Sequence, residues 1–307
     1  MADTPPPLPL DTSFDPQIGQ PVEVAPGLVR VTAPNGGPFT FTGTNSFLIG
    51  DGRVALLDPG PDDARHLAAL RRAIAGRAVE AIILTHTHSD HSASAARLKA
   101  ELGAPLWFGG PHRLSRPLRP FELNPIRRDC DWDLVPDRTL VDGENFEAGG
   151  IGLTTITTPG HCANHLCFSF RGTDLLLSGD HVMGWNSTLV SVPDGSMADY
   201  LASLRKVIAL GARRYLPAHG GPIADGAAFA RALLAHRELR NRQIVDAVNG
   251  GAHSIANLLR RIYPTLSPKL RLAAMLNLRA HVEYLDTQGL ITMRRGVFGL
   301  RLSPARP

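Results

Sequence analysis

Cysteine and aromatic residues are scarce in this chain. Its 307 residues include 3 cysteines (Cys130, Cys162 and Cys167), and 6% of the residues are aromatic. Three cysteines cannot form a disulfide framework, and no pair has the spacing of a zinc ribbon, so a disulfide-stapled secreted module is excluded. This cysteine usage is typical of a reducing compartment, and we expect a cytoplasmic protein.

Long apolar segments are absent as well. No stretch reaches the roughly 18 consecutive apolar residues that span a membrane. Residues 1–16 lack the basic start and the apolar run of a signal peptide. Residues 1–18, with three consecutive prolines, are instead expected to form an exposed leader. We therefore expect no membrane partner.

The net charge is small but unevenly distributed. The chain carries a formal +4 at pH 7; residues 236–307 contribute +8, from twelve Lys or Arg and four Asp or Glu, so the remainder carries −4. A basic C-terminal part favours a polyanionic substrate, although a solubilising surface explains the same charge. The length allows one large domain and a smaller one.

One stretch, Thr-His-Thr-His-Ser-Asp-His, concentrates the chemistry-bearing residues. It holds His86, His88, Asp90 and His91 within six positions, a density that chance produces in about one such chain in a thousand. An apolar run at 81–84 before it predicts a buried strand, and residues 92–102 after it predict a helix. Open α/β sheets place their active sites at such strand ends. Imidazole and carboxylate clusters suit zinc or another first-row divalent metal.

Three later segments, each after an apolar run, end in further ligand-type residues. They are Thr-Pro-Gly-His ending at His161, Leu-Ser-Gly-Asp ending at Asp180, and Leu-Pro-Ala-His-Gly containing His219. Together with the first motif they resemble the metallo-β-lactamase superfamily, in order and over most of the chain. The family's third-histidine loop, bridging aspartate and last-histidine loop would lie at these three positions.

The resemblance implies two zinc ions, with other divalent first-row metals possible. His86, His88 and His161 would hold the first ion. Asp90, His91 and His219 would hold the second, with Asp180 bridging. It also implies hydrolysis by water activated between the ions, with Asp90 and Asp180 as the catalytic residues. The residues expected behind the ligands or beside a substrate are Asp58, His165, His181, Trp185 and Asn186.

Some of these supporting roles have alternatives. Asp58 before Pro59 is equally typical of a turn, and Trp185 equally typical of core packing. His112, between Pro111 and Arg113, is expected to be a surface histidine and not a ligand.

Strands alternating with helices, and the resemblance, predict an α/β four-layer αββα sandwich over residues 19–232. After it the pattern becomes helical at 233–248, 254–262 and 267–286, followed by a hairpin over 290–302. This predicts a winged-helix-like C-terminal domain over residues 233–307. Such a module contacts nucleic acid, forms a wall of the active-site cleft or makes a dimer contact, so a homodimer is possible.

The substrate class is predicted from features outside the metal-ligand motifs. The residues Gly184, Trp185 and Asn186 resemble the endoribonuclease branch of the family. A loop over 112–128 adds five arginines. These features predict phosphodiester cleavage of single-stranded RNA. A small-molecule thioester of the glyoxalase II kind, or a lactone or ester, is the alternative; a β-lactamase or a non-catalytic binding protein is disfavoured.

Overall fold

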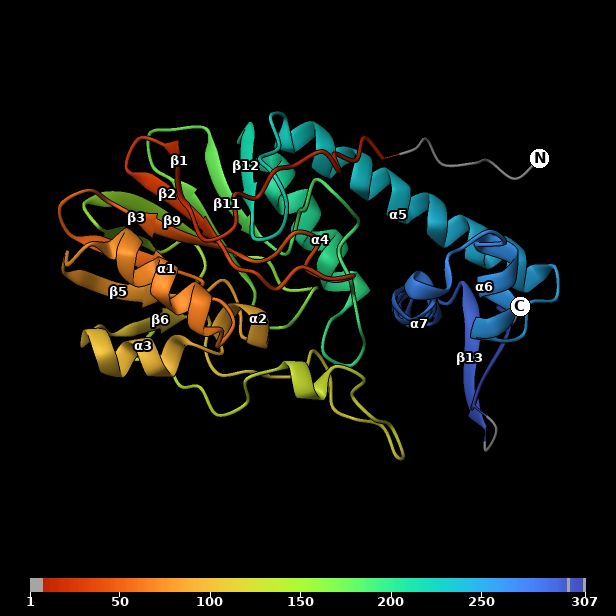
Figure 1. Cartoon of the computed structure of the whole chain (residues 1–307). Coiled ribbons are helices and arrows are strands. Elements are labelled where there is room, and N and C mark those ends of the chain that lie inside the picture. The colour runs from red at the N-terminus through yellow and green to blue at the C-terminus, as the bar shows by residue number, and fades with distance from the viewer. Residues whose placement is uncertain (1–7, 297–298, 306–307) are drawn as a thin grey trace.

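The computed structural model describes residues 8–296 and 299–305. Two β-sheets pack face to face, with helices on both outer sides (Figure 1). The first sheet has seven strands in sequence order, antiparallel from β1 to β4 and parallel from β4 to β7. They are β1 (Pro21–Ala25), β2 (Leu28–Thr32), β3 (Asn45–Ile49), β4 (Val54–Leu57), β5 (Val79–Ile83), β6 (Leu106–Phe108) and β7 (Arg138–Thr139).

The second sheet has five strands in the order β12-β11-β10-β9-β8, and only β11 and β12 are parallel. Leucine and phenylalanine side chains from both sheets, such as Phe47 and Phe168, form the buried layer between them. The strands are β8 (Asn145–Ala148), β9 (Ile151–Thr157), β10 (Leu166–Phe170), β11 (Leu175–Gly179) and β12 (Arg214–Pro217).

Helices cover the outer face of each sheet. On the first sheet, α1 (Ala64–Ile74) and α3 (Ala95–Leu102) bury Leu67, Leu70 and Leu98. On the second, α4 (Met197–Ala209) and the start of α5 (Gly226–Asn249) bury Leu204 and Leu233. The predicted αββα sandwich is therefore confirmed. Within the described residues, no helix is long and apolar enough to cross a membrane.

Three helices and a hairpin form the C-terminal part. The second half of α5 packs with α6 (Ile255–Ile262), α7 (Arg271–Thr287), β13 (Ile291–Gly296) and β14 (Gly299–Pro304) around a separate apolar core. Val297 and Phe298 of the expected hairpin lie outside the described residues. Helix α5 runs without a break across position 232 (Figure 1). The winged-helix-like assignment and the boundary at 232/233 stay predictions.

Local structure differs from expectation in two places near the site. The helix expected at 92–102 begins later, as α3 at Ala95, and a separate short helix, α2 (Ser89–Ser92), precedes it. Ser94 between them donates to the carbonyls of Pro59 and Gly60 (2.9 and 3.0 Å). The sequence also predicts paired strands over residues 22–32 and 39–49, but residues 39–44 form a loop in which Phe41 has a positive φ of 53°. Both departures place backbone turns beside the metal-type residues, which are the seven His and Asp residues expected to bind metal.

The expected leader lies partly outside the described residues, which begin at Leu8. From there to position 18 the side chains are mostly exposed. The segment nevertheless follows the protein surface, because Asp11 N–H donates to the Gly184 carbonyl (2.9 Å) and Phe14 lies under the Arg30 guanidinium.

Candidate metal centre

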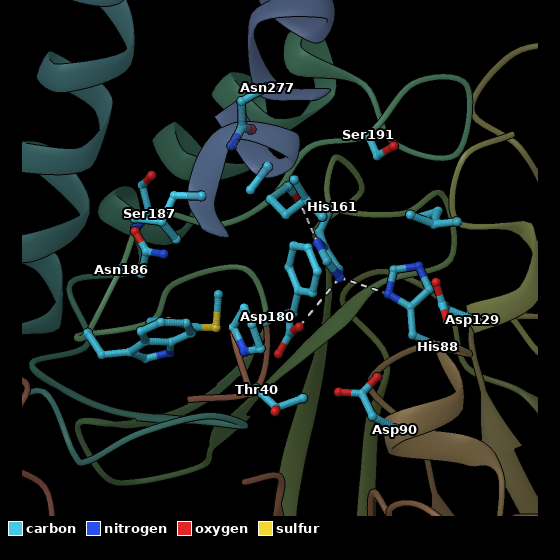
Figure 2. Close-up of a pocket in the computed structure, with 18 of the residues that line it drawn as sticks. Thr40, His88, Asp90, Asp129, His161, Asp180, Asn186, Ser187, Ser191 and Asn277 are labelled. Atoms are coloured by element: carbon cyan, nitrogen blue, oxygen red, sulfur yellow. Dashed lines mark hydrogen bonds and ion pairs between the residues drawn. The ribbon is translucent and has the colours of Figure 1, made fainter. Parts of the chain in front are cut away.

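Loops at the ends of four strands bring the seven expected ligand residues together. The motif that contains His86 follows β5, and His161, Asp180 and His219 follow β9, β11 and β12 respectively. Figure 2 shows His88, Asp90, His161 and Asp180 converging on one side of a pocket. The strand predicted before the first motif is confirmed, and the apolar runs before the other three segments form strands as well.

Three buried imidazoles face one another at the first group. The Nδ1 atom of His88 lies 3.0 Å from His86 Nε2 and 2.8 Å from His161 Nε2. Burial lowers the pKa of His86 well below its ordinary value, and burial together with His88 lowers the pKa of His161 to about 4. Burial opposes charge on His88 as well, but its hydrogen bond to Asp194 raises the pKa of this ring. Neutral rings present lone pairs, and lone pairs that point at one place are satisfied by a cation.

Asp180 lies between this group and a second one. Its Oδ2 is 3.4 Å from His161 Nε2, and its Oδ1 is 3.6 Å from His91 Nε2 and 3.3 Å from His219 Nε2. Asp90 Oδ2 is 3.2 Å from His219 Nε2 and 3.4 Å from His91 Nε2. Burial opposes ionisation of Asp180, but His219 and His91 outweigh it and hold its pKa well below the ordinary range.

The residues present fit a metal centre. Two buried atoms, His91 Nε2 and Asp180 Oδ1, have no hydrogen-bond partner among the described residues, an arrangement that is costly unless a further group satisfies them. The ligand atoms of His86, His88 and His161 lie within 4.8 Å of one another, as do those of Asp90, His91 and His219. Five imidazoles and two carboxylates suit zinc or another first-row metal. The division into two ligand sets stays a prediction.

Asp58 supports the motif directly. Its Oδ2 lies 3.0 Å from His91 Nδ1 and accepts a hydrogen bond from Thr85 Oγ1 (2.7 Å), and its Oδ1 accepts from Thr85 N–H (2.7 Å). Its backbone has a positive φ of 47°, so Asp58 also makes the turn. The two alternative interpretations of this residue therefore describe one arrangement.

The other residues expected near the metal lie at different distances from the pocket surface. His165 accepts from the Asp180 backbone N–H (3.0 Å) and its Nδ1 lies 2.8 Å from Thr158 Oγ1. His181 is fully buried, with its ring 5.1 Å from that of Tyr200, and lies behind the site. Trp185 and Asn186 line the pocket instead. Trp185 is stacked on Phe41, with ring centroids 4.9 Å apart and an interplanar angle of 9°.

Asp194 and His112 were missed as site residues. Asp194 Oδ2 lies 3.0 Å from His88 Nε2, and its Oδ1 lies 2.8 Å from His112 Nε2. His112 is buried beside Trp132, with ring centroids 4.3 Å apart, so the expectation of a surface histidine is wrong. The motif at residues 85–91 does not indicate either residue. The only sequence signal is the Pro-Asp-Gly-Ser turn that contains Asp194, and such turns are typical of ordinary loops.

A cavity of 620 Å³ opens above the metal-type residues. Its floor includes His88, Asp90, His161 and Asp180, and Figure 2 shows Asn277 of α7 across it from Asp90. Most of the wall is apolar or aromatic, and none of the described residues that line it is Lys or Arg. The apolar and aromatic lining residues are Pro38, Phe39, Pro61, Ala93, Ile126, Met183, Trp185, Leu189, Tyr263, Leu266, Leu270, Ala273 and Ala274.

The loop that carries His161 is packed too tightly to tolerate a side chain at Gly195. A Cβ there would lie 2.4 Å from the Gly160 carbonyl oxygen and 2.5 Å from that of His161. We expect Gly195→Ala to displace His161 and lower the bound metal measured by elemental analysis. Gly52→Ala is the matched control, because a Cβ at Gly52 meets nothing within 4 Å. Unchanged metal content in Gly195→Ala would mean that the loop can yield without moving its histidine.

The sequence matches a known protein family and curated proteins that resemble its members. The sequence profile of the metallo-beta-lactamase superfamily matches residues 39–219. The lactamase-like protein vrtG of Penicillium aethiopicum is 30% identical over 232 residues, which cover 74% of this chain and 67% of that protein. An atrochrysone carboxyl ACP thioesterase of Aspergillus fumigatus is 29% identical over 233 residues, covering 73% and 66%.

Solved structures agree with the observed architecture. A metallo-beta-lactamase family protein from Thermus thermophilus superposes with a TM-score of 0.74 at 27% identity, covering 92% of this chain and 100% of that one.

Proposed function

Because the chain belongs to the metallo-β-lactamase superfamily of metal-dependent hydrolases, we propose that it hydrolyses acyl thioesters whose acyl group occupies the apolar cavity. The cavity carries this proposal. A largely apolar wall above carboxylates and imidazoles favours a substrate with an apolar acyl part and a reactive carbonyl at its end. The thioesterase relative from Aspergillus fumigatus supports the same reaction class.

The proposed roles follow from where each side chain lies. Metal ions bound here would lower the pKa of water to about 7 and polarise the scissile carbonyl. His86, His88, His91, His161 and His219 would hold them with Asp90 and Asp180. Asp90 also lines the cavity, with its side chain 29% exposed, so it can orient a water molecule and accept its proton. A thiolate leaving group suits this site, because thiols have a pKa of about 8.5 and leave without a strong acid.

Single-stranded RNA is the second candidate, favoured by the basic C-terminal part. The arginine loop, residues 112–128, supports RNA binding less than its five arginines suggest. Arg116 and Arg119 both pair with Glu283, at 2.6 and 3.3 Å. Arg127 and Arg128 are exposed and remain able to contact phosphates.

The two candidates are separated by one substrate comparison. The metal-loaded protein is given an octanoyl thioester of N-acetylcysteamine and, separately, a labelled single-stranded RNA at two salt concentrations. We expect thioester turnover and no RNA cleavage. RNA cleavage that weakens steeply with salt, falls in Arg127→Ala/Arg128→Ala and occurs without thioester turnover would overturn the thioesterase proposal in favour of RNA.

Reducing the cavity tests where the acyl group lies. Ala274 of α7 lines the wall, so we expect Ala274→Phe to raise KM for the octanoyl thioester about tenfold, in the range that pocket contacts contribute. KM for the acetyl thioester should change little. Ala100→Phe, at an exposed position of α3, is the control. Equal effects on both chain lengths would place the acyl group elsewhere.

A further inference from the structure

We propose that the C-terminal helices hold the His161 side of the metal centre in place through two positioning residues, Arg237 of α5 and Asn277 of α7. Both act on one short segment, residues 188–190, which lies between these helices and the metal-type side chains. The inference rests on the metal centre proposed above and not on the identity of the substrate.

One side of the 188–190 segment contacts the metal-type residues. The Leu189 carbonyl oxygen lies 2.7 Å from His161 Nδ1 and accepts its hydrogen. That bond keeps the proton on Nδ1, so Nε2 presents its lone pair toward His88. Thr188 Oγ1 donates to the backbone carbonyls of Asp180 (2.8 Å) and His181 (3.0 Å). The segment therefore fixes the orientation of His161 and the backbone of Asp180.

The other side of the segment is bound by the C-terminal helices. Asn277 Oδ1 accepts a hydrogen bond from Val190 N–H (2.9 Å). Arg237 donates to the Thr188 carbonyl, and its second terminal nitrogen lies 3.4 Å from Asn277 Oδ1. The two side chains thus hold backbone groups on either side of Leu189, and they come from two different helices.

Arg237 is an unusual residue for a helix interface. It is 3% exposed, its guanidinium lies 5.3 Å from the centre of the Tyr200 ring, and no carboxylate among the described residues pairs with it. Burying a cation without a carboxylate is costly, and an apolar side chain would pack there at less cost. An apolar residue, however, could not make the hydrogen bond that Arg237 donates to the 188–190 segment. The position of that segment explains why an arginine fits here.

The test is metal affinity, which requires no substrate. Asn277 contributes only an acceptor oxygen to Val190, so Asn277→Ala should free the segment, and Asn277→Asp should restore it. We expect Asn277→Ala and Arg237→Met to weaken one of the two metal equivalents about 10–100-fold in competition with a chelator, the effect typical of losing a group that orients a ligand. The cobalt-substituted protein should show a changed visible spectrum, and Asn277→Asp should match the wild type in both measurements.

Arg240→Met is the matched control. Arg240 is also buried on α5, but its guanidinium lies over Tyr263 (4.4 Å) and contacts Gln243, away from the 188–190 segment. It should lower the melting temperature while leaving metal affinity unchanged. Wild-type affinity and spectrum in both Asn277→Ala and Arg237→Met would overturn the proposal, as would an equal loss in Asn277→Asp or in Arg240→Met. If Arg237→Met does not fold, the comparison of Asn277→Ala with Asn277→Asp decides alone.

Discussion

Asp180→Asn is expected to remove at least one metal equivalent and to lower kcat by on the order of 10³-fold, the scale of losing a principal charge-stabilising group. The reason is the position of the carboxylate. Asp180 faces His161 with one oxygen, and His91 and His219 with the other. An amide of the same shape keeps one acceptor oxygen but loses the negative charge, and it places an NH₂ group toward one set of imidazoles.

The measurement combines elemental analysis after reconstitution with excess zinc and turnover of the best substrate. Asp174→Asn is the control, because Asp174 lies exposed in the turn before the same strand, β11. Two equivalents retained by Asp180→Asn would show that Asp180 does not join the two groups. Loss of metal in Asp174→Asn as well would mean that strand β11, and not the carboxylate, had been disturbed.

The ligand-type residues were predictable because each lies in a short local motif. His86, His88, Asp90 and His91 fall within six positions, and the remaining three follow apolar runs that form strands. Strand β5 belongs to the first sheet and β9, β11 and β12 to the second, so the common site depends on how the two sheets pack. It was expected because the order of the motifs resembles that of the metallo-β-lactamase superfamily. The sandwich follows from the same alternation of strands and helices.

Asp58 was expected as a partner of these residues, and it contacts His91. Asp194 and His112 were not predictable, because their contacts join distant segments that no motif links. Asp194 lies 106 positions from His88 and 82 from His112. The partners of the arginine loop could not be predicted for the same reason, because Arg116 pairs with Glu283, which is 167 positions away. Sequence spacing could show that the loop is basic and irregular, but not that a glutamate on α7 takes up part of its charge. The length of α5 across position 232 depends likewise on packing against two cores.

Asp194→Asn is expected to weaken the metal equivalent predicted at His86, His88 and His161 about 10–100-fold, the range typical for a group that orients a metal-binding histidine. Asp194 accepts hydrogens from His88 Nε2 and from His112, and their hydrogen bonds outweigh burial and hold its pKa well below the ordinary range. With the proton kept on Nε2, His88 Nδ1 turns a lone pair toward His86 and His161. An asparagine that offers its NH₂ group to Nε2 would move that proton to Nδ1 and remove the lone pair.

The predicted defect therefore has a specific signature. Activity of Asp194→Asn should be low at limiting metal and recover when metal is raised, whereas Asp180→Asn should not recover. Asp129→Asn, an exposed carboxylate on the cavity wall, is the control and should keep wild-type metal affinity. His112→Ala should weaken the same equivalent to a smaller extent, since it removes one group that holds Asp194 while leaving the contacts of Asp194 with His88 and Cys130. Wild-type chelator resistance in Asp194→Asn would show that His88 keeps its orientation without this carboxylate.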